Sequence, residues 1–365
     1  MVNFEQLSPY SQALLKKLDA DKSSLNEPKL IASLSDRDLY TVHWKYLKTA
    51  LSCGLKVENV YRIIKFKQDA FCAKYINICV NARKNATNIF ERELYKLCQN
   101  ALFGKMIENV RDRTKIKFIT WRQTLRSNAT KATYKDTKYV NKKLCIAIHR
   151  NDEILLEKFP FTGSSILDLA KNHMYYNYYF NIKPHLGSDS KLIFGDTDSL
   201  YCFYKLTAPD NLDLLKKLIP ILDTSNLEKD HPLFSEERKS IPNFFKDESG
   251  EKKIFWEIIA VKPKLYNILW ILKDDFDKED AVFEQIIRAK GIPRDIAMLL
   301  KHEEFRQCVL EDMTFEKKRP TIAMKDFILT TEQVSKLALS SGDTKRFWTC
   351  NQHSLPFGHF EIESL

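Results

Sequence analysis

One ten-residue string constrains the fold of this chain more than any other part of it. Residues 192–201 read Leu-Ile-Phe-Gly-Asp-Thr-Asp-Ser-Leu-Tyr. Apolar residues lead into and out of this string, which predicts two short strands, and Gly195 stands where a tight turn needs a glycine. We therefore expect a β-hairpin with Asp196 and Asp198 at its tip.

Two carboxylates on one turn need a reason to be there. At about 4 Å and an effective dielectric constant of about 20, they repel each other by about 4 kcal/mol. A divalent cation offsets this repulsion, and Mg²⁺ prefers one or two carboxylates together with substrate phosphates. Two such ions support phosphoryl transfer. For an isolated Asp-x-Asp pattern, an ordinary β-turn is the alternative, because Asp is a common turn residue.

A second pattern lies in residues 74–110, which contain no proline and favour a long helix. Lys96, Asn100 and Phe103 are spaced to share one helix face. Lys96 would neutralise triphosphate oxygens, and Phe103 with the bare backbone of Gly104 would form a wall beside a base pair. The alternative is an amphipathic helix with a solvated lysine. Three further cations precede this face and would either extend it or belong to a solvated surface: Arg83, Lys84 and Arg92.

A third pattern reads Lys-Pro-Lys-Leu-Tyr at residues 262–266. Lys264 offers a point charge to a phosphate, and Tyr266 offers a ring for stacking and a hydroxyl. By strand alternation both would lie on one face. Alone this is a weak signal. The backbone amide at Lys290 and Gly291 is a weaker candidate for contact with a nucleic-acid phosphate.

The remaining local patterns predict a mixture of helices and strands. We expect strands and helices at these residues: helix 5–22, strands 116–120, 144–149 and 153–159, a helix capped by Thr162-Gly163-Ser164, a turn at Ser249-Gly250, a meander of strands 254–261 and 265–272, and helices 283–288, 293–300 and 331–338.

The composition is that of a folded protein of 365 residues with a net charge of +10, which is compatible with a nucleic-acid partner. The eight cysteines form no Cys-x-x-Cys pair, which favours reduced thiols and an intracellular protein, nuclear or cytoplasmic. We expect no signal peptide and no membrane partner, since no apolar run approaches the roughly 20 residues of a membrane span.

The three patterns resemble motifs of family B DNA polymerases and follow the family's order. Residues 192–201 resemble motif C, the palm hairpin that presents the catalytic aspartates. Residues 95–105 resemble motif B, K-x-x-x-N-x-x-Y-G, with Phe103 where the family usually has Tyr. Residues 262–266 resemble the K-x-Y motif of protein-primed members, which holds the primer end.

The flanking strings are similar to polymerases of Polinton (Maverick) elements and their viral relatives. They stand at residues 108–111, 165–169 and 245–248, and the resemblance runs from about residue 36 to 360. It implies an α+β right-hand fold, with a palm β-sheet and helices, helical fingers and a mixed thumb. The implied segments are a residual palm or insertion segment at 1–70, fingers at 71–110, a strand-rich insertion at 111–162, palm at 163–268 and a thumb-like region at 269–365.

The resemblance also implies the function of a DNA-directed DNA polymerase that uses two Mg²⁺ ions. Its partners would be primer–template DNA, deoxynucleoside triphosphates and a protein primer. Asp198 and Asp196 would be the catalytic and metal-binding residues. The implied nucleotide-binding residues are Lys96, Asn100, Phe103, Gly104, Arg92, Lys84 and Arg83. The implied DNA- and primer-binding residues are Lys264, Tyr266, Lys262, Lys290 and Gly291.

Two parts of the family pattern have no good copy in this sequence. Motif A, D-x-x-S-L-Y-P, would supply a second metal-binding aspartate, and Asp36-Arg-Asp38-Leu-Tyr40 is the nearest string. The acidic motifs of a proofreading exonuclease are also absent. We therefore expect an N-terminally truncated polymerase that binds DNA but extends a primer little or not at all. Two alternatives stay open: a catalytically inactive DNA-binding remnant, and an unrelated basic protein that binds nucleic acid or metal.

Overall fold

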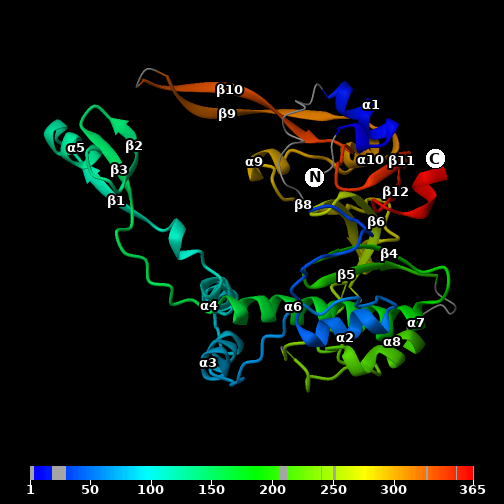
Figure 1. The fold of residues 1–365 in the computed structure, drawn as a ribbon. Coiled ribbons are helices and arrows are strands. Elements are labelled where there is room, and N and C mark those ends of the chain that lie inside the picture. Colours follow the sequence, from blue (N-terminus) through cyan, green and yellow to red (C-terminus); the bar gives the residue numbers. More distant parts are fainter. Residues whose placement is uncertain are drawn as a thin grey trace. The chain divides into compact units, whose positions relative to one another are not determined.

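The computed structural model describes residues 4–18, 30–205, 212–239, 241–249, 252–325, 328–350 and 352–364. It consists of helices and antiparallel sheets, which confirms the expected α+β class (Figure 1). The chain forms two compact units. Unit 1 comprises Met1–Tyr40, Ile182–Thr321 and Thr331–Leu365, and unit 2 comprises Thr41–Asn181 and Ile322–Thr330.

Unit 2 is built on helices. They are α2 (Trp44–Ser52), α3 (Ala73–Lys84), α4 (Ile89–Met106), α5 (Arg122–Ala129) and α6 (Pro160–Tyr176), which continues as a π-helical turn, η4 (Asn177–Ile182). The single long helix expected at 74–110 is wrong, because the chain breaks between α3 and α4. The Asn88 side chain accepts a hydrogen bond from the Glu91 backbone N–H at 2.8 Å, and this cap starts a new helix.

Helix α6 packs closely on the end of α4. A Cβ atom added to Gly163 would lie 1.9 Å from Cγ2 of Ile107, so only glycine permits this approach. The expected cap at Thr162-Gly163-Ser164 is wrong, since the helix already begins at Pro160. Proline suits the first helical position because a backbone N–H there would have no partner within the helix, so its absence costs nothing.

The sheet of unit 2 has the strand order β1–β3–β2 and is antiparallel. Its strands are β1 (Thr114–Ile119), β2 (Tyr134–Asn141) and β3 (Leu144–Arg150). Two of the three expected strands are confirmed, but the one at 153–159 is wrong and β2 takes its place. The close pairing of Asn141 with Leu144 explains this, because a short hairpin brings β2 onto β3 at small entropic cost.

The core of unit 1 lies between the β6–β7–β8 sheet and two helices. The elements are β6 (Lys253–Lys262), β7 (Leu265–Leu272), β8 (Glu284–Ala289), α9 (Arg294–Ala297) and α10 (His302–Leu310). The expected meander is confirmed. The helix expected at 283–288 is wrong, because these residues pair with β7 as β8. Apolar side chains from all these elements share one cluster, which includes Ile259, Leu265, Ile296 and Phe305.

The remaining helices are α1 (Pro9–Lys17), α7 (Lys183–Leu186) and α8 (Leu212–Leu218), and the remaining strands form three pairs: β4 (Lys191–Asp196) with β5 (Ser199–Phe203), β9 (Phe315–Lys325) with β10 (Ile328–Leu339), and β11 (Phe347–Cys350) with β12 (His353–Leu355). All lie in unit 1 except Ile322–Thr330 of the β9–β10 pair, which belong to unit 2. Residues 331–338, expected as a helix, are a strand within β10. Of the helix expected at 5–22, residues 19–22 lie outside the described residues, as does Gly250 of the expected turn.

The two ends of the chain meet inside unit 1. The backbone N–H of Leu34 donates to the Phe357 carbonyl at 2.9 Å, and that of Ala32 donates to the Lys345 carbonyl at 2.9 Å. The Tyr10 hydroxyl donates to Asp312 at 2.5 Å. The N-terminal segment is therefore held by the last 60 or so residues of the chain.

Candidate functional site

The β4–β5 hairpin places two aspartates at its tip, as expected. Asp196 pairs with Ser199, so Thr197 and Asp198 are the two turn residues. Thr197 has a φ of +62°, and the Asp198 N–H donates to the Asp196 carbonyl at 2.7 Å. Gly195 lies inside β4 rather than in the turn. A Cβ atom there would stand 3.3 Å from the Ser199 carbonyl oxygen, so glycine allows the two strands to close.

Lys264 comes from the turn between β6 and β7 and reaches the same tip. Its ammonium donates hydrogen bonds to a carboxylate oxygen of Asp196 and, at 3.0 Å, to the Thr197 hydroxyl. This hydrogen bond to Lys264 lowers the pKa of Asp196. Because Lys264 is a turn residue with a φ of +64°, the strand alternation that we expected for it is wrong. The contact with the hairpin is made nonetheless.

Tyr266 fixes the hairpin against β7 through its ring. The ring centroids of Tyr266 and Phe194 lie 4.4 Å apart, and Phe194 stacks on Tyr201 at 4.3 Å. Only 5% of Tyr266 is exposed, and burial raises the pKa of Tyr266 to about 12. The ring therefore packs against protein in this arrangement rather than lying open for stacking on a base.

The other expected DNA-binding residues divide into two sets. The Lys290 backbone N–H donates to the Lys264 carbonyl at 3.0 Å, and the Lys290 charge adds to the lowering of the pKa of Asp196. Gly291 follows with a φ of +94°. Lys262 instead donates to the Gly342 carbonyl at 3.4 Å, and burial lowers the pKa of this lysine. Asp196, Asp198, Lys264 and Lys290 thus form one group at the tip of the hairpin, the hairpin cluster, and Lys262 does not belong to it.

The tip of the hairpin carries two carboxylates, the side chains in this cluster with the chemistry to hold a metal ion. Hard carboxylate oxygens from Asp196 and Asp198 suit Mg²⁺, which completes its shell with water and phosphate oxygens. Within the described ranges, no group of three or more His, Cys, Asp or Glu side chains is placed to hold a metal ion. Asp36 and Asp38, the nearest match to motif A, are exposed in the segment just after Leu34.

The expected nucleotide-binding residues lie in unit 2. Lys96 is exposed on α4 and forms an ion pair with Glu93 at 3.7 Å. Asn100 is also exposed, whereas Phe103 and Gly104 are half-buried. The three other expected cations are exposed, two in α3 and one in α4: Arg83, Lys84 and Arg92. That this face and the Asp196–Asp198 hairpin share one cleft stays a prediction, since they belong to different units.

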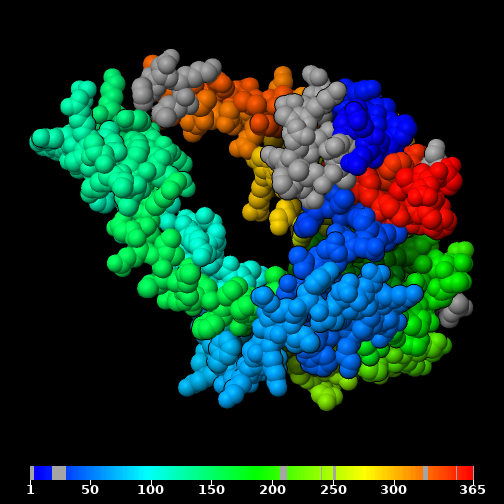
Figure 2. All heavy atoms as spheres, in the orientation of Figure 1, coloured from blue at the N-terminus to red at the C-terminus, as the bar shows by residue number. Residues whose placement is uncertain are grey.

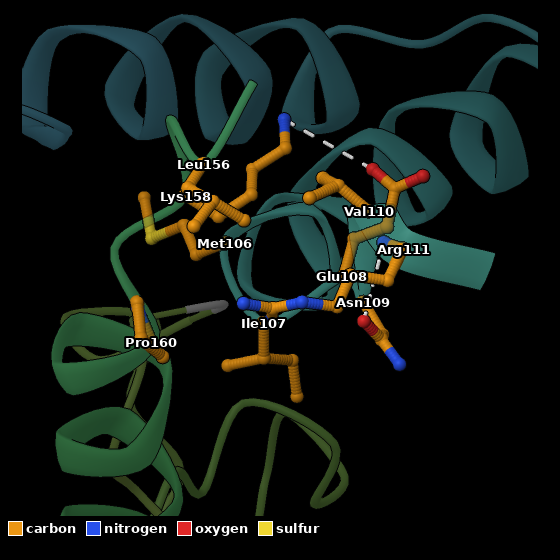
Figure 3. A pocket seen from close by; sticks show the side chains of 9 residues that line it. All are labelled: Met106, Ile107, Glu108, Asn109, Val110, Arg111, Leu156, Lys158 and Pro160. Carbon is orange, nitrogen blue, oxygen red and sulfur yellow. Dashed lines mark hydrogen bonds and ion pairs between the residues drawn. The ribbon is translucent and has the colours of Figure 1, made fainter. Parts of the chain in front are cut away.

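A cavity of about 330 Å³ lies at the C-terminal end of α4, where sequence reasoning placed no site (Figure 3). It is lined by Met106, Ile107, Glu108, Asn109, Val110, Arg111, Leu156, Lys158 and Pro160. Most of the lining is apolar, and Glu108 and Lys158 bring opposite charges to it. The cavity lies where the chain leaves α4 for β1 and returns from β3 to α6.

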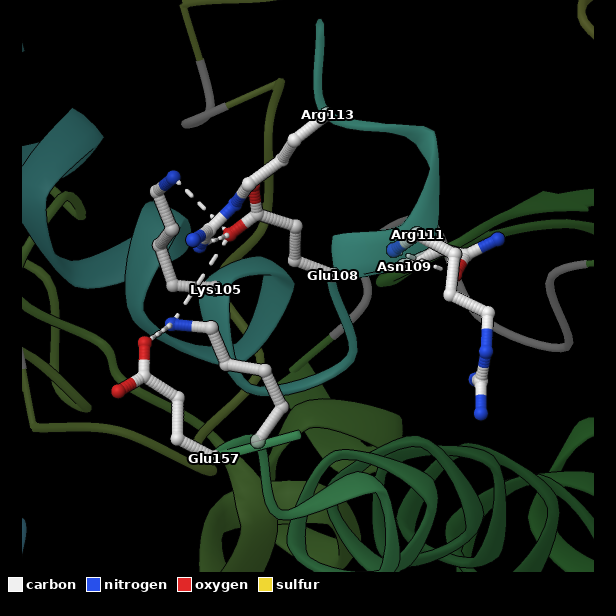
Figure 4. Close-up of polar contacts among 7 residues, drawn as sticks. Lys105, Glu108, Asn109, Arg111, Arg113 and Glu157 are labelled. Carbon is white, nitrogen blue, oxygen red and sulfur yellow. Dashed lines mark hydrogen bonds and ion pairs between the residues drawn. The ribbon is translucent and has the colours of Figure 1, made fainter. Parts of the chain in front are cut away.

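Glu108 is the centre of the polar contacts beside this cavity (Figure 4). Its carboxylate accepts two hydrogen bonds from the Arg113 guanidinium, at 2.8 and 3.0 Å, and one from the Lys105 ammonium at 3.2 Å. The Lys158 ammonium lies 3.9 Å away. The Arg113 and Lys105 hydrogen bonds lower the pKa of Glu108 from its ordinary 4.5 to about 2. Glu108 thereby ties α4 to β1 and to the start of α6.

This arrangement predicts a pH-dependent effect of Glu108→Gln. The pKa of Glu108 is lower in the folded protein than in the unfolded chain, so ionised Glu108 stabilises the folded state. This stabilisation is complete above pH 4.5 and is lost as the pH falls towards 2. At pH 7 we expect the variant to unfold at a lower temperature than the original protein. The difference should shrink between pH 4.5 and 2, as thermal unfolding followed by circular dichroism would measure. Glu157→Gln, at an exposed neighbour, is the control, and an equal effect of both changes would contradict the prediction.

Comparison with known proteins connects part of the chain with one family. The family model of DNA polymerase type B, organellar and viral, matches residues 6–187. The matched range includes α4 and ends just before β4. Searches of curated proteins and of solved structures found no match. Among the described residues, no helix is both long enough and apolar enough to cross a membrane.

Proposed function

We propose that this chain carries the nucleotide- and primer-binding parts of a DNA-directed DNA polymerase. The family match supports a type B DNA polymerase and, with it, DNA and deoxynucleoside triphosphates as partners. The observation that carries the proposal is the contact between Lys264 and Asp196, which lie 68 positions apart in the sequence. It joins two of the three sequence patterns at one place in unit 1.

In this proposal the hairpin cluster is where the primer end and the metal ions meet. Asp196 and Asp198 hold Mg²⁺, which when bound stabilises the charge on the attacking and leaving oxygens. Lys264 offers its ammonium to the phosphate of the primer end, and it gives up its hydrogen bond to Asp196 as it does so. Tyr266 keeps the hairpin in place through its packing on Phe194.

Helix α4 binds the incoming nucleotide in this proposal. Lys96 and Asn100 contact the triphosphate, and Phe103 with Gly104 forms the wall beside the new base pair. Arg83, Lys84 and Arg92 extend the phosphate-binding surface. Unit 2 would then supply the fingers and the strand-rich insertion, and unit 1 the palm and the thumb-like region. The proposal also includes a protein primer as a partner of the chain. It further includes a relationship of the chain to Polinton polymerases.

The second candidate is a DNA-binding remnant without turnover. It is favoured by one observation, namely that the string nearest to motif A, at Asp36 and Asp38, lacks the Ser and Pro of the motif. A remnant would keep the DNA-binding surface but would not select a nucleotide by its complementarity to the template. Templated nucleotide binding therefore separates the two candidates.

The test is binding of a deoxynucleoside triphosphate to the chain in complex with primed DNA, in the presence of Ca²⁺. We expect the complementary nucleotide to slow dissociation of the DNA and the three others to have no effect. Lys96→Ala should weaken this response at least about tenfold, as expected when a charged hydrogen bond is lost. Affinity for the DNA alone should hardly change.

Lys105→Ala is the matched control, because Lys105 lies nine residues beyond Lys96 and hence on the opposite side of α4. The control should keep the response to the complementary nucleotide. Equal stabilisation by all four nucleotides would reject the polymerase and favour the remnant. Equal loss in both variants would show that Lys96 is only a surface charge.

A further inference from the structure

The positive charge of this chain is concentrated in one segment. Residues 113–150 contain eleven Lys and Arg and a single acidic residue, Asp136, a balance of +10 that equals the net charge of the whole chain. All eleven cations are exposed. Figure 2 draws the atoms of this segment in blue-green. Of these cations, only Arg113 and Lys115 form ion pairs with other described residues, namely Glu108 and Asp152. A charge of this density attracts an anionic partner.

The same segment forms the β1–β3–β2 sheet, which has one covered face and one open face. Ile119, Cys145 and Ala147 are buried on one face, where Leu125 of α5 packs against them. Figure 1 shows α5 beside these strands. Neighbouring residues along a strand point to opposite faces, so Phe118 and Ile146 lie on the other face.

The open face carries an aromatic ring and a cation in one row. Phe118 in β1 pairs with Ile146 in β3, and Ile146 pairs with Lys138 in β2. Residues that pair across antiparallel strands share a face. In the next row Ile116 pairs with Ile148, and Ile148 pairs with Asp136, the one acidic residue of the segment. Phe118 is 72% exposed and Ile116 is 58% exposed, so no described part of the chain covers this edge of the face.

The row has the dimensions of a nucleotide. Neighbouring strands are about 4.8 Å apart, which puts Phe118 and Lys138 about 10 Å apart across β3. A base stacked on the Phe118 ring would leave its phosphate within reach of the long Lys138 side chain. Single strands present unpaired bases for stacking, whereas a duplex presents mainly phosphates to a flat sheet. An exposed ring with a cation in the same row therefore favours a single strand.

We propose that the open face of the β1–β3–β2 sheet binds single-stranded nucleic acid. The Phe118 ring stacks on a base, Ile116 and Ile146 extend the apolar platform, and Lys138 and Arg150, which the strand pairing places on the same face, neutralise the phosphates. This site is separate from the hairpin cluster and from the Lys96 face. It needs neither metal nor nucleotide, so it stands or fails independently of the polymerase function.

The test compares two oligonucleotides of about 16 nucleotides, the upper end of the usual size for one such site. One is oligothymidylate and the other has the same backbone without bases. Phe118→Ala in the full chain should weaken binding of oligothymidylate about tenfold, the usual loss for one stacked base. It should leave binding of the abasic strand unchanged. Phe118→Trp should restore binding, and Lys138→Glu should weaken binding of both strands.

Phe360→Ala is the matched control, since Phe360 is 76% exposed and lies elsewhere, in unit 1. It should bind both strands like the original protein. Ultraviolet cross-linking of oligothymidylate to the unaltered chain should label residues 114–150, which tests the site even if a variant fails to fold. Equal losses for Phe118→Ala and Phe360→Ala, or labelling only outside this segment, would overturn the proposal. Binding to anionic lipid vesicles in place of oligothymidylate would also overturn it and assign the face to a membrane.

Discussion

Purified residues 1–365 are expected to bind primed DNA about a thousandfold more tightly at 50 mM salt than at 200 mM, if about six phosphates are contacted. The reason is counterion release, because each phosphate neutralised by Lys or Arg frees a bound cation. Lys264, Lys290 and the cations of residues 113–150 supply such contacts without reading bases. The affinity should therefore be nearly the same for unrelated sequences, as fluorescence anisotropy over a range of salt concentrations would measure.

The same preparation should extend the primer little or not at all. A polymerase must position the reacting groups and stabilise the charge that develops on them. The hairpin supplies carboxylates for this from one pair of strands, β4 and β5, and a second carboxylate-bearing strand is needed to hold both metal ions. Metal-dependent incorporation that Asp198→Asn abolishes would contradict this expectation. It would mean that another carboxylate completes the site, and Asp36 and Asp38 would be the first to replace. An affinity that does not change with salt would contradict the binding prediction itself.

Lys264→Met is expected to strengthen binding of Mn²⁺ at the hairpin about tenfold, which corresponds to about 1.4 kcal/mol. The Lys264 ammonium occupies an oxygen of Asp196 and opposes a second positive charge beside it. Its removal frees that oxygen as a ligand. Electron paramagnetic resonance of free Mn²⁺ measures this affinity without any need for catalysis, with Asp196→Asn to show that binding occurs at the hairpin.

The control for this prediction is Lys262→Met. Lys262 precedes the same turn, but its ammonium is bonded to the Gly342 carbonyl and not to the hairpin. We expect this variant to bind Mn²⁺ like the original protein. Unchanged affinity in Lys264→Met would show that the hydrogen bond to Asp196 does not compete with a metal ion. An equal gain in Mn²⁺ affinity in both variants would show that the effect comes from the lower positive charge of the protein and not from the hydrogen bond to Asp196.

The features that could be predicted from the sequence are those with local causes. The β4–β5 hairpin follows from apolar arms around Asp196 and Asp198, and the β6–β7 meander from two apolar runs on either side of Lys264. The start of α4 at Asn88 has a local signal too, an Asn three residues before Glu91, but the continuous helix pattern around it hid the break. Local reasoning thus identified elements better than it identified their ends.

The remaining errors arise where distant pairing decides the structure. Residues 284–289 become a strand because β7 lies beside them, and residues 331–338 do so because they pair with β9. Likewise, the hydrogen bond of Lys264 to Asp196 depends on the fold of unit 1, although each residue could be selected by its motif. Of the three cations around Glu108, Lys158 is the one from a distant segment, whereas Lys105 and Arg113 lie three and five residues away, and this local spacing is the signal that could have identified the cluster.

Because the N-terminal segment pairs with residues near the C-terminal end in unit 1, it can form these contacts only after nearly the whole chain has been synthesised. Leu34 has no partner until Phe357 has been made. At about 5–20 residues per second, that wait lasts roughly 15 to 60 seconds. Residues 41–181 form a continuous stretch of unit 2 and emerge whole long before. Unit 2 can thus begin folding during synthesis, while the N-terminal segment waits unpaired for the last strands to be released.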